Sequence, residues 1–405
     1  MAVGLVEPEQ LQPVKGMRCA AVAAGIKKKS GTPDLVLLEM AEASRCAAVF
    51  TRNKFCAAPV ILARQHLHDA APRYLLINAG NANAGTGQQG LDDALQTCQI
   101  LADHAQCSAG QVLPFSTGVI GQNLPVDKFV SAIPTALQQL DENGWLSAAR
   151  GIMTTDTLAK GISRQFELQG KTVTITGIAK GSGMIRPDMA TMLGFIATDI
   201  AISASLLDAC LRQAVDLSFN AITVDGDTST NDACVLIATG QAGNAEITRQ
   251  DADYNVFYQA LLEVCQFLAQ AIIRDGEGAT KFVTVAVVNA ATEDDARHIA
   301  YTVAHSPLVK TALFASDPNW GRILAAVGRS GVDLDLQGIK IYLDDVCIVS
   351  HGGRDSAYTE EQGQKVMAQD EIVIRIDMNA GRSQARIWTS DLSYDYVKIN
   401  AEYRT

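Results

Sequence analysis

The pattern of apolar and polar residues along the chain predicts a mixture of strands and helices. Short continuous apolar runs are typical of buried strands, whereas apolar residues that recur every three or four positions indicate one face of a helix. Leu35–Met40 is a clear strand, and residues 91–107 repeat their apolar side chains at helical spacing. Residues 163–179 alternate in polarity around a Gln-Gly-Lys turn, which predicts a hairpin.

These patterns continue over the whole chain without a linker rich in Ser, Gly or Pro, and we find no internal repeat. A glycine-rich loop is expected at 181–191. We predict further strands at 47–50, 74–78, 193–198, 221–224, 233–239, 282–289, 339–343, 371–378 and 384–389, and further helices at 125–140, 206–217, 254–273 and 293–304. The sequence therefore predicts an α/β protein whose two halves pack intimately.

Composition narrows the class of protein. The 405 residues are 48% hydrophobic, which is enough to bury a full core, and the net charge of −11 makes a nucleic-acid partner a poor prediction. Nine cysteines without a CxxC pair are typical of reduced core residues. No apolar run reaches the length of a membrane span, and the first residues do not resemble a signal peptide. We expect a cytoplasmic protein without a membrane partner.

Several familiar site patterns fail on spacing. The GxGxxG match at residues 85–90 does not follow its strand directly, as a dinucleotide site requires. Asp225-Gly-Asp227 lacks the later ligands of a calcium loop, and the six histidines form no zinc set. No Gly-x-Ser-x-Gly elbow is present. We therefore expect no metal and no resident cofactor, and we expect the glycine-rich blocks at 78–85 and 225–232 to be structural or to support a site from behind.

The segment from 177 to 196 is the richest in candidate chemistry. Lys180 opens a Gly-Ser-Gly loop that leads through Arg186-Pro-Asp to Met189-Ala-Thr191 and a buried strand. Composition alone is also compatible with an ordinary loop in which Thr191 lines the core. Together with other blocks in the same order, however, this segment resembles the ornithine acetyltransferase (glutamate N-acetyltransferase) family. The blocks are residues 55–60, 78–85, 114–120, 153–157, 223–232, 274–281, 316–319, 351–354 and 400–405.

The resemblance implies an α/β fold with layered sheets between helices, similar to a sandwich of the N-terminal-nucleophile type. It also implies that the chain cleaves itself between Ala190 and Thr191 into an α chain, 1–190, and a β chain, 191–405. The two chains would interleave in one fold, with two of each in the assembly. A threonine hydroxyl needs an adjacent base, and an N-terminal threonine has one in its own amine, whose unperturbed pKa is about 7.7–8.0.

The implied reaction moves an acetyl group from N-acetylornithine to glutamate through an acetyl-Thr191 ester. The resemblance assigns the oxyanion hole to Thr117 and Gly118, a hydroxyl and a backbone N–H that an acyl transfer requires. It assigns substrate binding to Thr154, Lys180, Thr191, Glu277, Asn400 and Thr405.

Some members of the family also acetylate glutamate from acetyl-CoA, and the sequence leaves acetyl-CoA open as a co-substrate. Two other functions remain as alternatives. An aminopeptidase of related fold would transfer the acyl group to water, and a binding protein for amino acids would perform no reaction.

Overall fold

The computed structural model describes residues 2–186 and 192–402. Its strands form three sheets, and the first has the order β1-β2-β4-β5. This sheet is mixed: β1 and β2 pair antiparallel, as do β2 and β4, whereas β4 and β5 run parallel. The bounds are Met17–Val22 for β1, Leu35–Met40 for β2, Tyr74–Asn81 for β4 and Val112–Val119 for β5.

The second sheet has the order β3-β10-β8-β7-β6 and packs face to face on the first. The core between them includes an edge-on contact of Phe115 in the first sheet with Phe195 in the second, with ring centroids 5.1 Å apart. Strands from both sides of residue 190 share this sheet. They are Arg45–Phe50 (β3), Lys160–Leu168 (β6), Lys171–Lys180 (β7), Leu193–Thr198 (β8) and Ala233–Ala238 (β10).

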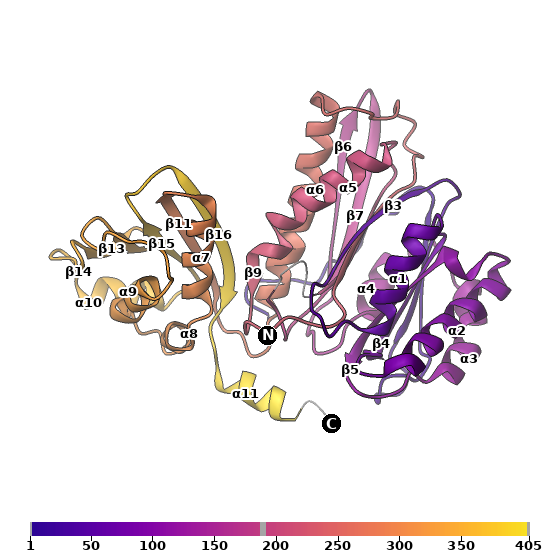
Figure 1. Ribbon diagram of the computed structural model, residues 1–405, viewed down its shortest axis with the longest axis horizontal. Coiled ribbons are helices and arrows are strands. Elements are labelled where there is room, and N and C mark those ends of the chain that lie inside the picture. Colours follow the sequence, from indigo (N-terminus) through magenta and orange to yellow (C-terminus); the bar gives the residue numbers. More distant parts are fainter. Residues whose placement is uncertain (1, 187–191, 403–405) are drawn as a thin grey trace.

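Helices cover the outer faces of this pair of sheets, and Figure 1 shows the resulting layers. Helices α2 and α3 pack on the first sheet, and α5 and α6 pack on the second. Helices α1 and α4 add to the core between the sheets. Their bounds are Ala58–Asp69 (α1), Gly87–Ala105 (α2), Val126–Gln138 (α3), Trp145–Gly151 (α4), Ala204–Asp216 (α5) and Ala252–Arg274 (α6).

The third sheet lies beyond α5 and α6 and has the order β14-β13-β12-β15-β11-β16-β9 (Figure 1). Its apolar residues join those of α5 and α6 in one core. The strands are Ile222–Thr223 (β9), Phe282–Ala290 (β11), Lys340–Leu343 (β12), Val346–Ser350 (β13), Gly353–Arg354 (β14), Glu371–Asp377 (β15) and Ser383–Ser390 (β16). The helices of this region are Glu293–Ala304 (α7), Pro307–Phe314 (α8), Trp320–Gly328 (α9), Glu360–Met367 (α10) and Tyr394–Ala401 (α11).

Helix α6 is the one described helix that is long and apolar enough to cross a membrane by length and composition. Half of its most apolar window is buried in the protein. It contacts β6 and β7 on one side and β16 on another. Helix α6 therefore packs as a core helix, which explains its apolar composition.

The structure confirms the predicted α/β class with layered sheets, and every strand and helix expected from the pattern is present within a few residues. Pro134 lies inside α3. The pattern missed β1, β5, β13, β14, α1, α4 and the short helices after α7. Missing β5 matters most, because Thr117 and Gly118 lie near the C-terminal end of this strand.

Candidate active site

A cavity of about 300 Å³ opens where the ends of β5, β7, β8 and β10 converge. Both polar and apolar side chains line it. Its lining residues are Ala82, Thr117, Gly118, Val119, Ile120, Thr154, Thr155, Lys180, Gly181, Gly183, Met184, Ile185, Met192, Leu193, Ser229, Thr230, Asn231, Asp232, Glu277 and Asn400. Both sheets of the sandwich and the C-terminal helix α11 therefore contribute to one small pocket.

Thr117 and Gly118 reach the cavity from the end of β5. Gly118 pairs with Gly80 of β4 and has a φ of +134°, which favours glycine. A Cβ atom on Gly118 would lie 2.3 Å from the carbonyl carbon of Gly80, so no larger residue fits. Glycine at 118 is thus required by the close approach of the Gly80 backbone, and both Gly118 and Thr117 line the cavity.

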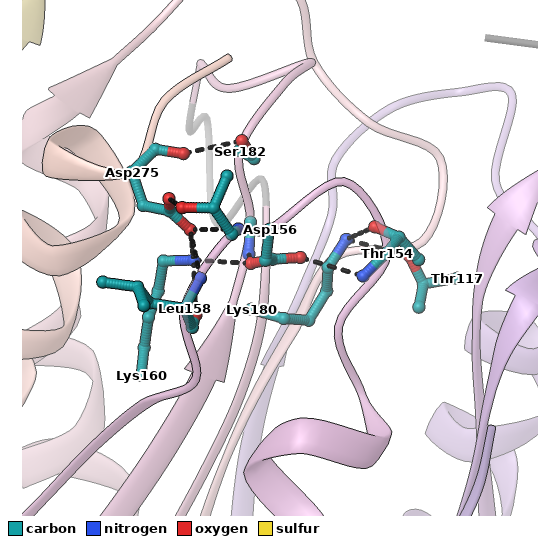
Figure 2. Close-up of polar contacts among 10 residues, drawn as sticks. Thr117, Thr154, Asp156, Leu158, Lys160, Lys180, Ser182 and Asp275 are labelled. Carbon is teal, nitrogen blue, oxygen red and sulfur yellow. Dashed lines mark hydrogen bonds and ion pairs between the residues drawn. The ribbon is translucent and has the colours of Figure 1, made fainter. Parts of the chain in front are cut away.

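Lys180 connects two hydroxyl groups that line the cavity (Figure 2). Its Nζ donates to Oγ1 of Thr154 at 2.8 Å and to Oγ1 of Thr117 at 3.2 Å. Burial lowers the pKa of Lys180, and the nearby carboxylates of Asp156, Asp232 and Glu277 oppose that shift. Its ammonium group is the cation that an anionic group in this cavity would meet.

A buried ion network lies directly behind Thr154 and Lys180 (Figure 2). Lys160 Nζ lies 2.6 Å from a carboxylate oxygen of Asp156 and 2.6 Å from one of Asp275, with both ion pairs almost fully removed from solvent. Burial by itself raises the pKa of Asp156, but the ammonium groups of Lys160 and Lys180 outweigh it and hold that pKa well below its usual value. The carboxyl group of Asp156 is therefore an anion.

The same carboxylates hold the backbone segments that carry the cavity side chains. Asp156 accepts the N–H of Thr154 at 3.0 Å and that of Gly181 at 2.8 Å. The backbone carbonyl of Asp275 accepts the Ser182 hydroxyl at 2.6 Å. The network thus joins the 154 loop, the end of β7 and the turn after α6, and sequence reasoning missed it. A charged residue at 160, within an otherwise apolar strand start, was the available signal.

Glu277 faces the cavity from that turn. Its carboxylate accepts the side-chain amide of Asn400 in α11 at 2.8 Å, and its backbone N–H donates to Ser182 at 3.0 Å. A Cβ atom on Gly183 would lie 2.3 Å from Oε2 of Glu277, so glycine at 183 leaves room for the carboxylate. Glu277 is buried, whereas Asn400 is exposed. The cavity therefore has an anion at this end and a cation at Lys180.

The loop after β7 is held firmly up to Ile185. The Asp225 carboxylate accepts the N–H groups of Met184 at 2.7 Å and Ile185 at 3.0 Å. The carbonyl of Ile185 accepts the N–H of Val224 at 2.8 Å. Met184 has a φ of +55°, a left-handed conformation that is strained for a residue with a side chain. The chain thus enters residues 187–191 from a fixed and strained position.

Asp232 is a cavity residue that the sequence reasoning missed. Its carboxyl group is buried, and its Oδ2 has no hydrogen-bond partner among the described residues. Burial raises the pKa of Asp232 well above its usual value, against the opposing effects of Ser229 and Lys180. Residues 229–232, at the end of a block that was expected to be structural or to support a site from behind, line the cavity. Ala82, from the other block assigned as structural, also lines it.

The structure brings six of the predicted site residues together around the cavity. They are Thr117, Gly118, Thr154, Lys180, Glu277 and Asn400. The predicted cleavage residues Ala190 and Thr191 and the terminal Thr405 lie outside the described residues. Within 2–186 and 192–402, no group of three His, Cys, Asp or Glu side chains is placed to hold a metal ion. All nine cysteines are described, and all are free thiols.

A small cavity in a sandwich of sheets, with charged side chains and hydroxyl groups in its lining, has the features of an enzyme site. The ArgJ family model matches residues 18–405. An arginine biosynthesis bifunctional protein ArgJ of Pseudomonas fluorescens (strain Pf0-1) is 57% identical over 407 residues and covers 100% of both chains. One of Methylococcus capsulatus is 56% identical over 397 residues, covering 98% of this chain and 97% of that protein.

The chain therefore belongs to the ArgJ family, and it is an acetyltransferase of arginine biosynthesis. Two solved structures are also similar. The crystal structure of an ArgJ from Bacillus halodurans is 39% identical, with a TM-score of 0.49, over 51% of this chain and 97% of that one. The ornithine acetyltransferase of Mycobacterium tuberculosis, solved with ornithine, is 36% identical, with a TM-score of 0.39, over 44% of this chain and 96% of that one.

Proposed function

We propose that this chain transfers the acetyl group of N2-acetylornithine to glutamate through an acetyl ester on Thr191. The observation that carries the proposal is the hydrogen-bonded row of Thr117, Lys180 and Thr154 facing Glu277 across one cavity. Those groups provide a cation, an anion and hydroxyl donors within the reach of one amino acid. The ornithine named with the Mycobacterium tuberculosis relative is a molecule of this size and charge.

The proposed binding mode follows from charge. The Lys180 ammonium and the Thr154 hydroxyl bind the α-carboxylate of N-acetylornithine, because a cation and a donor already meet there at 2.8 Å. Glu277, held by Asn400, pairs with the δ-ammonium group. The family resemblance also assigns Thr405 to substrate binding. Between these ends the acetamide group lies beside Thr117 and Gly118.

The acyl transfer then has two steps. The Thr191 hydroxyl attacks the acetyl carbon and gives its proton to the Thr191 amine. The C–N bond of the substrate breaks, and ornithine leaves with that proton on its nitrogen. Glutamate's amine attacks the ester in the reverse sense and yields N-acetylglutamate. In both steps the oxyanion is stabilised by the Thr117 hydroxyl and the Gly118 N–H, a type of contact commonly worth about 10²–10³ in rate.

Formation of that nucleophile requires cleavage between Ala190 and Thr191, which we propose the chain performs itself. The Thr191 hydroxyl attacks the Ala190 carbonyl, and water opens the resulting ester. The strained Met184 and the hydrogen bonds of Ile185 support this proposal, because they hold the backbone at 184–185, a few residues before the bond in the sequence. Cleavage leaves an α chain of 1–190 and a β chain of 191–405, which we propose assemble as two of each.

Intact-mass and N-terminal analysis of the purified protein tests both parts. We expect one fragment beginning at Thr191 and a single full-length species for Thr191→Ala, which should also be inactive. A Thr191→Ala chain that is still cut at this bond would contradict the assignment. Initial rates with both substrates varied should give the parallel lines of double displacement. Hydrolysis of peptides, or release of acetate, in the absence of glutamate would favour the aminopeptidase alternative.

The acetyl donor and the cellular location are further parts of the proposal. An assay with acetyl-CoA and glutamate alone decides whether acetyl-CoA is a second donor, and we propose no resident cofactor. The nine free cysteines support a reducing compartment, so we place the enzyme in the cytoplasm. Fractionation of cells followed by activity measurement tests this location.

A further inference from the structure

The cavity contains an acid that the proposed roles leave unused. Three ionisable side chains line it among the described residues: Lys180, Asp232 and Glu277. Lys180 donates to two hydroxyl groups, and Glu277 accepts from Asn400. Oδ2 of Asp232 has no such partner in the same part of the chain. A buried polar atom without a partner is unfavourable in a folded protein, so this oxygen calls for an explanation.

The backbone around Asp232 places this residue beside Met192, the residue that follows Thr191 in the sequence. The N–H of Ala233 donates to the carbonyl of Met192 at 3.0 Å, and Ala233 pairs with Leu193 in the parallel register of β10 and β8. Asp232 therefore lies beside Met192, and Met192 directly follows Thr191 in the sequence.

The position of Asp232 is also fixed from the opposite side. The side-chain amide of Asn231 donates to the carbonyls of Ala82 at 2.6 Å and Ser116 at 2.9 Å. Ser116 immediately precedes Thr117. The N–H of Thr51 donates to the Asp232 carbonyl at 2.9 Å. The backbone of Asp232 is thus held between the Thr117 segment and the strand that follows Thr191, and Asp232 lines the cavity between them.

We propose that Asp232 is a further catalytic residue, the acid that protonates the Thr191 nitrogen as the Ala190–Thr191 bond breaks. This inference rests on the proposed function. The Thr191 oxygen forms a bond to the Ala190 carbonyl carbon, and the carbon–nitrogen bond breaks. Asp232 gives its proton to the departing nitrogen and recovers the proton of the Thr191 hydroxyl. The net result is an ester and an amine, and the acid is restored.

The chemistry of the site fits that role. An amide nitrogen leaves poorly without a proton, and a positioned acid contributes about 10²–10⁴ to such a step. A carboxyl group can supply the proton near neutral pH only if it remains protonated there, and burial raises the pKa of Asp232 in that direction. Lys180 is already shared by two hydroxyl groups, and Glu277 is held by Asn400 at the other end of the cavity.

The test is a time course of self-cleavage, followed by intact mass, for Asp232→Asn against wild type. Asparagine has nearly the same size and is neutral, but it has no acidic proton to give. We expect uncleaved Asp232→Asn chain to accumulate, with cleavage slowed about 10²-fold or more. Asp227→Asn is the matched control, because Asp227 is exposed on the same loop and should cleave like wild type. The melting curve of uncleaved Asp232→Asn should match that of Thr191→Ala.

A second pair of variants tests the role of Asp232 if Asp232→Asn does not fold. Asp232→Glu and Asp232→Gln have the same size and differ in the acid, so the former should cleave measurably faster. Equal cleavage in Asp232→Asn and wild type, or in this pair, overturns the role of Asp232 and leaves the proposed function intact. A wild-type protein without any fragment beginning at Thr191 overturns the proposed function itself.

Discussion

Replacing Lys160 by methionine should destabilise the protein because it leaves two carboxylates buried without their shared cation. Asp156 and Asp275 each lose a 2.6 Å ion pair, and the side chains of Lys160 and Asp156 are 0% exposed, so solvent cannot compensate. Methionine has a similar length and is apolar, so the change in packing is small. Removing one partner of a buried ion pair typically costs about 3–5 kcal/mol.

That cost translates into a measurable shift of the melting temperature. With an unfolding entropy of about 2.1 cal/mol/K per residue, the 405 residues correspond to about 0.85 kcal/mol/K. The melting temperature should therefore fall by about 4–6 °C at pH 7. Differential scanning calorimetry on wild type and Lys160→Met measures this shift. Lys171→Met, at an exposed position of β7, is the control and should melt like wild type.

The pH dependence separates lost charge pairing from lost packing. In wild type the ammonium groups of Lys160 and Lys180 hold the pKa of Asp156 below its unfolded value, so this group stabilises the fold above that unfolded pKa and loses the effect in acid. Without Lys160 the burial of Asp156 acts with less opposition, so its pKa rises and the variant gains protons on folding. Its deficit should then be largest near pH 7 and should shrink toward pH 4. A deficit that is constant across this range would refute the reasoning, as would an unchanged melting temperature.

Four further predictions concern catalytic activity and self-cleavage. Thr117→Ala should lower kcat by about 10²–10³ because an oxyanion donor is lost, whereas Thr117→Ser should keep most of the rate in initial-velocity assays. Burial lowers the pKa of Lys180, so kcat/KM for N-acetylornithine should begin to fall with rising pH well before about 10.4, the pKa of a free lysine. Lys180→Arg should shift this fall to higher pH. A profile that stays flat to pH 10 contradicts the prediction. Asn400→Ala frees the Glu277 carboxylate and should raise KM about tenfold, yet it should leave the melting temperature unchanged because α11 contributes no buried residue. Asp225→Ala removes the acceptor of the Met184 and Ile185 N–H groups and should slow self-cleavage, visible as residual full-length chain on a denaturing gel; complete processing at the wild-type rate would argue against a role for that anchor.

Much of the fold was predictable because long apolar runs leave little choice. Leu35–Met40 and Leu193–Thr198 are strands with the predicted bounds, and Glu293–Ala304 is a helix with the predicted bounds. The missed strand Val112–Val119 has a proline and small polar residues, Ser116 and Thr117, where an apolar run was expected. It is a strand because β4 provides a parallel hydrogen-bonding edge, which no local pattern indicates.

The candidate site also contains residues that the sequence could predict and one that it could not. The family resemblance selected Thr117, Lys180 and Glu277, and these three side chains do line one cavity, although they lie far apart in the sequence. Asp232 could not be selected, because a lone aspartate after a polar loop is usually a turn residue. Its significance depends on burial and on an oxygen without a partner, which only the packed structure reveals.

The sequence by itself determined the class of fold, the family and the types of residue available for acyl transfer, because periodicity and motif order are local properties of the chain. The tertiary structure decided which charges meet. Lys160 pairs with Asp156 four residues before it and with Asp275 more than a hundred residues after it, and α11 delivers Asn400 to Glu277. These contacts arise from the packing of sheets whose strands come from both sides of residue 190, so no reading of neighbouring residues could foresee them.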